Sequence, residues 1–569
     1  MRQKIILITE LVFLCMSAFS QKTENSIRVN QIGYTTNEVK TAFIANKNAT
    51  SFEIKDAQTD KTVYQGKTSE NSYWKMSEEN LQTIDFSDFK QEGSYYIVCG
   101  NKKSYPFKIQ NEHLFNDISK ASIRAFYYWR ASTELLPQHA TWKGTDFSRP
   151  MGHKDDVVKI HSSAATKSRP EGTIVSAPKG WYDAGDYNLY VVNAGISYHA
   201  LAFAYEMMPE YYNSLNLNIP ESGNGVPDIL NELKWELDWL FAMQDEDGGV
   251  YTKLSSLRFC SMIMPHDDKL DRYMIGKSTA SALDFAAMMA MSARIFKPYE
   301  HIFPNISAKA TNAAKRAWNW AKSNPTVYYK NPSDVFTGNY RDDDVTDEFF
   351  WATAELYITT KDEKYFKELD FSQEFTVPEW GNVRTLGLMS LVLHNEVLPK
   401  EYSNVFASFQ KLTNDLYAMY ERSANKVPIE KFNWGSNGVI ASSGALLGLA
   451  FKEYGDEKYH RAMIDSWNYL LGCNPTDYCF ISGFGSKYPK HFHDRRCTSD
   501  GIEEPIPGYL AGGATNIILR DCGVKGYPST TPAGCYRDAI CSFSTNEIAI
   551  NWNAPFALLA GMVESYSNK

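Results

Sequence analysis

The sequence predicts a mainly α-helical chain that begins with a small all-β domain. Short β-branched and aromatic runs recur roughly every 8–12 residues up to about residue 109. From about residue 112 onward, apolar residues recur with the helical period instead. The 569 residues are too many for a single hydrophobic core, so we expect two or more domains.

Residues 1–20 have the pattern of an export signal. Arg2 and Lys4 precede an apolar run, and residues 18–20 offer the small residues of a cleavage site. The run is short for a membrane span, and no later segment stays apolar over about 18 residues. We therefore expect an exported protein, periplasmic or extracellular, without a membrane span. Small residues do not precede Cys15, which disfavours a lipid anchor there.

We expect a domain boundary between residues 109 and 112. Residues 22–109 are predicted to form a β-sandwich, because turn residues separate the strands at the spacing typical of that fold. Residues 112–569 are predicted to be helical, in roughly a dozen helices. Long loops join the helices, notably 138–180 and 495–535, and loops of this length usually carry a site. Helices are expected near residues 188–207, 229–240, 278–296, 308–323, 347–360, 384–398, 402–421, 441–454, 460–471 and 553–566.

Composition excludes one class of partner and favours another. The net charge of −9 gives no basic surface for nucleic acid. Aromatic residues make up 14% of the chain and include 13 Trp, enough for a large core and for rings that stack on sugars. Eight of the nine cysteines follow residue 20, either as buried thiols or in one or two disulfides. The chain is expected to be a monomer.

Two acidic segments stand among aromatic residues. In the run GWYDAGDY, Asp183 and Asp186 lie three residues apart and can converge on one water, whereas a helix cap would need only one acid. Glu547 has apolar and aromatic neighbours, where burial would raise its pKa; the alternative is an acid at a helix edge. Asp538 is interpreted as a hydrogen-bonded structural acid. One protonated and one ionised carboxyl group are what hydrolysis of a glycosidic bond requires.

A third segment, GSKYPKHFHDR, holds two histidines and an arginine within five residues. Its acidic partners are not spaced like a closed zinc site. We expect His493 and Arg495 to contact sugar hydroxyl groups, the alternative being a basic surface loop.

Together these segments resemble glycoside hydrolase family 9. The C-terminal match is specific in spacing, the GWYDAGDY run matches fully, and the His-x-Arg element is present as residues 493–495, although Phe492 and Asp494 replace the proline and histidine often found there. Residues 29–34 resemble the immunoglobulin-like domain that precedes many members. The C-terminal match rests on Tyr536, Asp538, Phe543, Glu547, Ala549, Asn553 and Ala554.

The resemblance implies an (α/α)6 barrel after an immunoglobulin-like β-sandwich, and hydrolysis with inversion. It assigns the catalytic base to Asp186, a helper that holds the water to Asp183, and the general acid to Glu547. Trp434 and Trp552 match sugar-stacking positions, with Trp351 and Trp380 as weaker matches and with the core as the alternative for each. His493 and Arg495 would bind substrate near the cleaved bond.

The resemblance also bears on metals. Members with this N-terminal domain often hold zinc with two Cys and two His, but only His153 of the four remains here, so we expect no zinc. Asp347 and Glu348 resemble the family's calcium loop, the alternative being an acidic helix start. A structural calcium ion is thus compatible with the sequence, and the chemistry requires no cofactor.

The predicted activity is inverting endo-β-1,4-glucanase on a β-glucan polysaccharide or oligosaccharide: cellulose-like, mixed-linkage or xyloglucan. The first alternative is an exo-acting cellodextrinase, β-glucosidase or glucosaminidase on the same fold. The second is a non-catalytic glycan-binding protein, which would have no need of all three acids.

Overall fold

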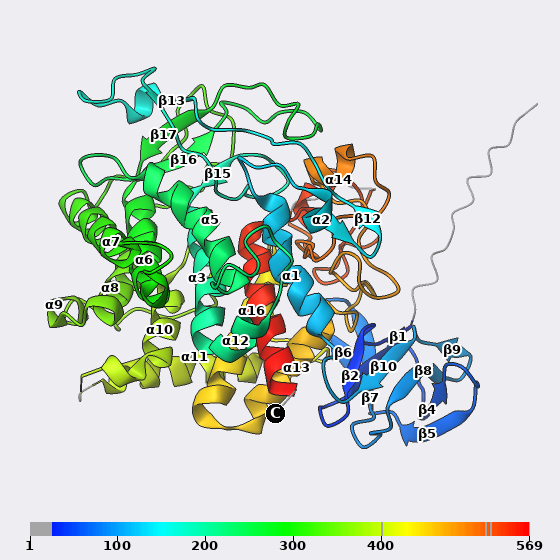
Figure 1. Cartoon of the computed structure of the whole chain (residues 1–569). Helices are drawn as coiled ribbons and strands as arrows, with labels where there is room; N and C mark the ends of the chain where they lie inside the picture. The colour runs from blue at the N-terminus through cyan, green and yellow to red at the C-terminus, as the bar shows by residue number, and fades with distance from the viewer. Residues whose placement is uncertain (1–25, 400–401, 518–519, 524–525, 568–569) are drawn as a thin grey trace, which may run out of the picture.

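The computed structural model describes residues 26–399, 402–517, 520–523 and 526–567. The expected export signal, residues 1–20, and Cys15 lie outside these ranges. A β-sandwich packs beside a larger helical domain, with their contact near α1 (Asn116–Trp129) and α13 (Glu457–Leu470) (Figure 1).

The β-sandwich consists of two sheets with an apolar core between them. Its strands are β1 (Ile27–Arg28), β2 (Gly33–Thr35), β3 (Thr41–Ala45), β4 (Ser51–Asp56), β5 (Thr62–Lys67), β6 (Ser72–Trp74), β7 (Glu79–Asp85), β8 (Gly93–Cys99), β9 (Lys102–Lys103) and β10 (Phe107–Gln110). One sheet has the order β1-β3-β7-β6, the other β2-β10-β8-β4-β5, with β9 paired to β8. Side chains of β10 alternate between the core and solvent, as expected for half-buried strands. The predicted sandwich is confirmed.

The helical domain is an (α/α)6 barrel, as predicted. The inner ring consists of α3 (Val191–Met207), α6 (Thr279–Ile295), α8 (Thr346–Thr360), α10 (Arg384–Leu393), α12 (Ser436–Tyr454) and α16 (Ile550–Ser567). The outer ring consists of α1, α5 (Asp228–Met243), α7 (Ile306–Ser323), α9 (Glu363–Phe366), α11 (Ser403–Arg422) and α13. In the inner ring, α3 packs on α6, α6 on α8, α8 on α10, α12 on α16 and α16 on α3, whereas α10 and α12 are linked through α11. Each outer helix packs on an inner one.

Burial separates the two rings. Helices α3, α6 and α12 are buried on nearly all sides, whereas α7 and α11 bury one face at the helical spacing. Because inner helices carry few charged side chains, those that occur there need a specific reason.

A five-stranded sheet of order β14-β13-β17-β16-β15 lies at one end of the barrel (Figure 1). Its strands are β13 (Val158–Ile160), β14 (Ile174–Val175), β15 (Leu189–Tyr190), β16 (Tyr251–Ser255) and β17 (Tyr273–Lys277). The segment 138–180, predicted to be a long loop, therefore contains short strands. Other short elements are α2 (Pro137–Ala140), β11 (Thr141–Trp142), β12 (Thr145–Asp146), η1 (Ser162–Ala164), α4 (Pro209–Ser214), η2 (Lys297–Tyr299), η3 (Asn395–Val397), α14 (Arg495–Ser499) and α15 (Phe543–Asn546).

The sandwich is fastened to the barrel through Asn30 and Gln31. The Asn30 amide donates to Asn468 Oδ1 at 2.9 Å, at the end of α13. Gln31 Oε1 accepts from the backbone N–H groups of Ser486 and Lys487, both at 2.9 Å. The second contact holds a segment that runs directly into the predicted substrate-binding histidine and arginine.

A disulfide joins Cys522 and Cys541. The remaining cysteines of the described ranges carry free thiols: Cys99, Cys260, Cys473, Cys479, Cys497 and Cys535. Among the described residues, every helix is too short or too polar to cross a bilayer.

Candidate active site

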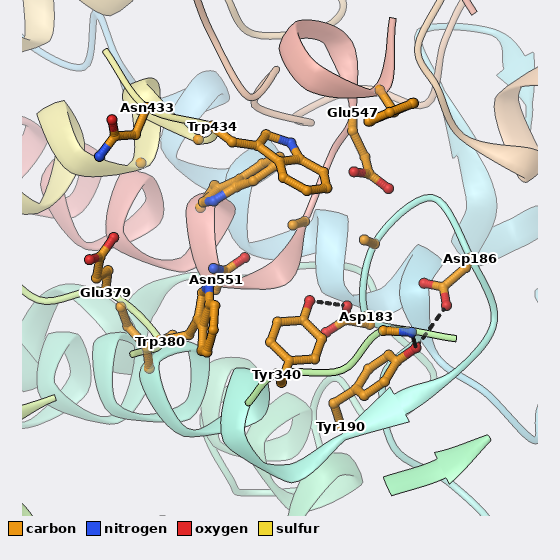
Figure 2. A pocket seen from close by; sticks show the side chains of 18 of the residues that line it. Asp183, Asp186, Tyr190, Tyr340, Glu379, Trp380, Asn433, Trp434, Glu547 and Asn551 are labelled. Atoms are coloured by element: carbon orange, nitrogen blue, oxygen red, sulfur yellow. Dashed lines mark hydrogen bonds between the residues drawn. The ribbon is translucent and has the colours of Figure 1, made fainter. Parts of the chain in front are cut away.

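A cavity of about 700 Å³ opens at the barrel end that carries the small sheet (Figure 2). Loops distant in sequence converge on it, because each inner helix begins or ends there. Its wall is largely aromatic, and the acids predicted from the sequence lie in it. Residues that line the cavity include Asp183, Asp186, Tyr190, Phe259, Tyr340, Trp380, Trp434, His493, Arg495, Phe543, Glu547, Asn551 and Trp552.

Asp183 is enclosed between two donors. Its Oδ1 accepts from Asn193 Nδ2 and its Oδ2 from the Tyr340 hydroxyl, both at 2.5 Å. Burial, and then the charge of Asp186, raise the pKa of Asp183 to about 8, although the two hydrogen bonds oppose this rise. At pH 7 the Asp183 carboxyl is therefore mostly protonated.

Asp186 faces the cavity from the same loop. Its Oδ2 accepts from Asn188 Nδ2 at 2.5 Å and from the Tyr190 hydroxyl at 3.4 Å. The Asn188 side chain is itself anchored, because its Oδ1 accepts from the backbone N–H of Ser256 at 3.1 Å. The carboxylate is thus fixed in one orientation by a buried amide and a phenol.

Glu547 lies across the cavity from the two aspartates (Figure 2). It follows α15 directly and precedes α16. Burial, and then the charges of Asp186 and Asp183, raise its pKa well above the usual range, while Arg495 and a backbone contact with Gly185 lower it. Glu547 is therefore the group of this site best suited to hold a proton near neutral pH.

His493 and Arg495 connect the two sides of the cavity. His493 Nδ1 bonds the carbonyl of Ile540 at 2.7 Å, and burial lowers the pKa of His493, which keeps the ring neutral. The Arg495 guanidinium donates to the carbonyls of Gly185 at 2.7 Å and Cys260 at 3.1 Å. Arg495 thereby braces the loop that carries Asp186.

The two predicted sugar-stacking tryptophans lie side by side. Trp434 is 45% exposed, and its ring lies 6.4 Å from that of Trp552 and 5.8 Å from that of Phe543. Trp552 is pressed against the backbone at Gly435 and Gly438, where a Cβ atom at Gly438 would approach its ring to 2.7 Å. Glycine is needed at these positions for the ring to lie flat in the wall.

Of the two weaker tryptophan candidates, one lines the cavity. Trp380 lies edge-on to Tyr340, with ring centroids 5.2 Å apart. Trp351 lies fully buried in the barrel core, where its indole N–H donates to Glu355 at 3.1 Å. Sugar stacking by Trp351 is therefore ruled out by its position.

Asp538 lies outside the cavity wall. It accepts from the backbone N–H groups of Lys490 at 3.0 Å and His491 at 2.8 Å, and from the Asn546 amide at 3.0 Å. These bonds tie the histidine segment to the segment that carries Glu547, which is the geometry of a structural acid.

Asp347 and Glu348 begin α8 close to the cavity. Asp347 Oδ2 accepts from the backbone N–H of Val383 at 2.7 Å, whereas both Glu348 carboxylate oxygens are buried without a hydrogen-bond partner within the described ranges. Both carboxylate oxygens of Asp284 are likewise buried without a hydrogen-bond partner within the described ranges. Burial, and then the charge of Asp347, raise the pKa of Asp284 well above its usual range. No set of three or more His, Cys, Asp or Glu in the described chain is arranged to hold a metal.

The positions that match the family's zinc ligands hold other contacts. His153 bonds the Tyr182 hydroxyl at 2.9 Å and Asp268 at 3.2 Å. In the stretch 130–132, which corresponds to the segment of the first ligand and has no cysteine, Arg130 is fully buried and donates to Glu232 at 3.0 Å. A charged and hydrogen-bonded network therefore occupies this region.

Several residues that line the cavity or bind its acids escaped the sequence analysis. Asn188 and Tyr190 directly follow the GWYDAGDY run, and Asn551 follows Glu547 by four residues, so proximity to a motif could have indicated them. Tyr340 and Asn193 reach Asp183 only through the fold, and no local signal marks them.

Comparison with known proteins agrees with this architecture. The model of glycosyl hydrolase family 9 matches residues 115–560, and that of the cellulase N-terminal immunoglobulin-like domain matches residues 22–104. A xyloglucan-specific endo-β-1,4-glucanase of Bacteroides ovatus is 37% identical over 579 residues, covering 98% of this chain and 97% of that protein. Endoglucanase D of Acetivibrio thermocellus is 34% identical, covering 95% and 84%.

A solved structure of a family 9 protein from Bacteroides ovatus superimposes with a TM-score of 0.89 at 35% identity, covering 96% of this chain and 100% of that one. The family match thus spans the barrel, the smaller match spans the sandwich, and the fold agrees over nearly the whole length. The chain is a glycoside hydrolase and belongs to glycosyl hydrolase family 9.

Proposed function

We propose that this chain is an endo-β-1,4-glucanase that hydrolyses β-glucan with inversion, with Glu547 as general acid and Asp186 as general base. The observation that carries the proposal is the presence of these two carboxyl groups on facing sides of one aromatic-lined cavity (Figure 2). Inverting hydrolysis needs a protonated carboxyl at the leaving oxygen and an ionised one behind a water.

The electrostatics supports this division of roles. Glu547, with its raised pKa, retains the proton that the leaving oxygen must receive. Asp186, held by Asn188 and Tyr190, takes the proton of the attacking water. Asp183, with a pKa near 8, holds the water as a hydrogen-bonding neighbour and leaves the base role to Asp186.

The substrate assignment rests on the cavity wall and on the relatives. Trp434, Trp552 and Trp380 offer faces and edges for successive glucosyl units, and His493 and Arg495 contact hydroxyl groups near the cleaved bond. Relatives named as endoglucanases, one of them xyloglucan-specific, favour internal cleavage of a β-1,4-glucan. We propose export through the 1–20 signal, and the Cys522–Cys541 disulfide is typical of exported proteins.

A calcium ion at the start of α8 would have a structural role. Asp347 and Glu348 would hold it together with nearby backbone carbonyls, because calcium takes oxygen ligands of these kinds. Chelation by EGTA should then lower Tm, and calcium alone should restore it. A Tm unaffected by EGTA in wild type, or equally affected in Glu348→Gln, would contradict the assignment. We propose that the chain does not bind a zinc ion.

The central test compares Glu547→Gln and Asp186→Asn with a surface control, Glu246→Gln. Each site variant should lower kcat on carboxymethylcellulose, lichenan or xyloglucan by about 10²–10⁴-fold. On 2,4-dinitrophenyl β-cellobioside, whose leaving group needs little protonation, Glu547→Gln should recover much of its rate, whereas Asp186→Asn should not. Viscosity should fall early relative to reducing ends.

The stereochemical outcome is a separate test. ¹H NMR of the first products should show the α-anomer before mutarotation. Release of the β-anomer first, or near-normal polysaccharide hydrolysis by either site variant, would overturn the proposal.

A further inference from the structure

Asn551 is a polar residue in the cavity wall that the proposed mechanism does not use. It lies in the first turn of α16, four residues beyond Glu547. In Figure 2 its side chain projects into the cavity between Trp434 on one side and Trp380 and Tyr340 on the other.

The Asn551 amide is buried but not satisfied. The residue is 7% exposed, and its Oδ1 has no hydrogen-bond partner within the described part of the chain. Asp183 and Asp186, by contrast, each accept two side-chain hydrogen bonds. Leaving a buried amide oxygen unpaired costs about 1–3 kcal/mol, and native proteins keep few such groups. Within the described chain, no protein group completes this bond.

The helix that carries Asn551 is held rigidly. The backbone N–H of Ile550 donates to the carbonyl of Asp183 at 3.0 Å. Asn553, two residues further along the same helix, accepts from the backbone N–H of Leu510 and donates to the carbonyl of Ser122, both at 2.8 Å. Asn551 therefore cannot reach a protein partner by rotating the helix, and its position is fixed relative to Asp183.

We propose that Asn551 is a specificity-determining residue that binds hydroxyl groups of the glucosyl unit lying between Trp434 and Trp380. Its Oδ1 accepts from one hydroxyl, and its Nδ2 donates to the oxygen of a neighbouring one. Two adjacent equatorial hydroxyls of a β-glucosyl unit can bond the two ends of one amide together. The inference deepens the proposed function and rests on it.

The test measures binding in an inactive background. Isothermal titration of cellotetraose into Glu547→Gln and into Glu547→Gln/Asn551→Leu should show binding roughly 10- to 100-fold weaker in the double variant. Leucine has nearly the size of asparagine and removes the unpaired amide, so Tm should stay equal or rise. As a matched control on the same helix, Asn553→Leu should lower Tm, because it breaks two satisfied hydrogen bonds.

Cellobiose analogues with a single deoxy position identify the hydroxyl. The Glu547→Gln protein should discriminate against one analogue, and the double variant should lose that discrimination, which is the coupling expected of a direct contact. Equal binding with and without Asn551→Leu, or a lower Tm with unchanged binding, would overturn the assignment and leave the proposed function standing. No binding of cellotetraose to Glu547→Gln would overturn both.

Discussion

Asp183→Asn should make the protein more stable, by an amount that grows with pH. Asp183 is 3% exposed and has a pKa of about 8 in the folded protein, against an ordinary 3.8. An acid with a raised folded pKa is ionised first in the unfolded chain, so the folded state loses stability as pH rises from about 4 to about 8. At about 1.4 kcal/mol per pKa unit, the loss at pH 7 is on the order of 4 kcal/mol.

Asparagine fits the same enclosure. Its oxygen can accept from Asn193 and its amide can donate to the Tyr340 hydroxyl, so both neighbours keep a partner. The substitution therefore removes the buried charge without opening a cavity. Relaxation of the site reduces the gain below the full value, but its pH dependence remains.

The assay is urea unfolding of both proteins between pH 4 and pH 8.5. The curves should coincide near pH 4 and separate in favour of the variant up to about pH 8. Asp521→Asn is a control of opposite sign, because hydrogen bonds from Tyr527 and Ser544 hold the pKa of Asp521 below its usual range despite burial. A difference that does not change with pH, or a wild type that is more stable at pH 8, would refute the reasoning.

Two further predictions concern the cavity wall and the acid. Gly438→Ala should push the indole of Trp552 out of the cavity wall. The value of kcat/KM on polysaccharide should then fall roughly 10-fold, which is about 1.4 kcal/mol. The far-UV circular dichroism spectrum should not change, and unaltered kinetics would contradict the prediction. Because Arg495 lowers the pKa of Glu547, Arg495→Gln should move the alkaline limb of the kcat/KM profile to higher pH, whatever its effect on the maximal rate. A limb that stays in place or moves to lower pH counts against Glu547 as the acid.

The helical domain was largely predictable because burial leaves a periodic record. The predicted helix 402–421 corresponds to α11, whose buried positions recur at the helical spacing. The helix predicted over 441–454 begins earlier, at Ser436, directly after Gly435, which adopts a left-handed conformation. Glycines favour loops in a sequence, which is why the prediction placed the start of the helix too late. Strands β13 and β14 were missed, since two or three residues carry too little alternation to be recognised.

The candidate site was predictable where chemistry is concentrated in a short segment. Asp183 and Asp186 lie in one motif, and the spacing around Glu547 is distinctive. The residues that tune these acids were not predictable, because Tyr340 contributes from a loop more than a hundred residues away and is brought near by the closure of the barrel alone. The residues that shift a pKa are neighbours in the folded structure, and they can be too distant in the sequence to be recognised from it.

The grip of Gln31 on the barrel has a consequence for how this protein can be recombined. Its side-chain oxygen accepts hydrogen bonds from two backbone N–H groups in the segment that leads to His493. In a chimera with a different sandwich, the new domain would have to supply a hydrogen-bond acceptor at the position of Gln31. Otherwise the backbone N–H groups of Ser486 and Lys487 would lose their partner at the domain interface. Exchange of the sandwich therefore also changes how the segment before His493 is held.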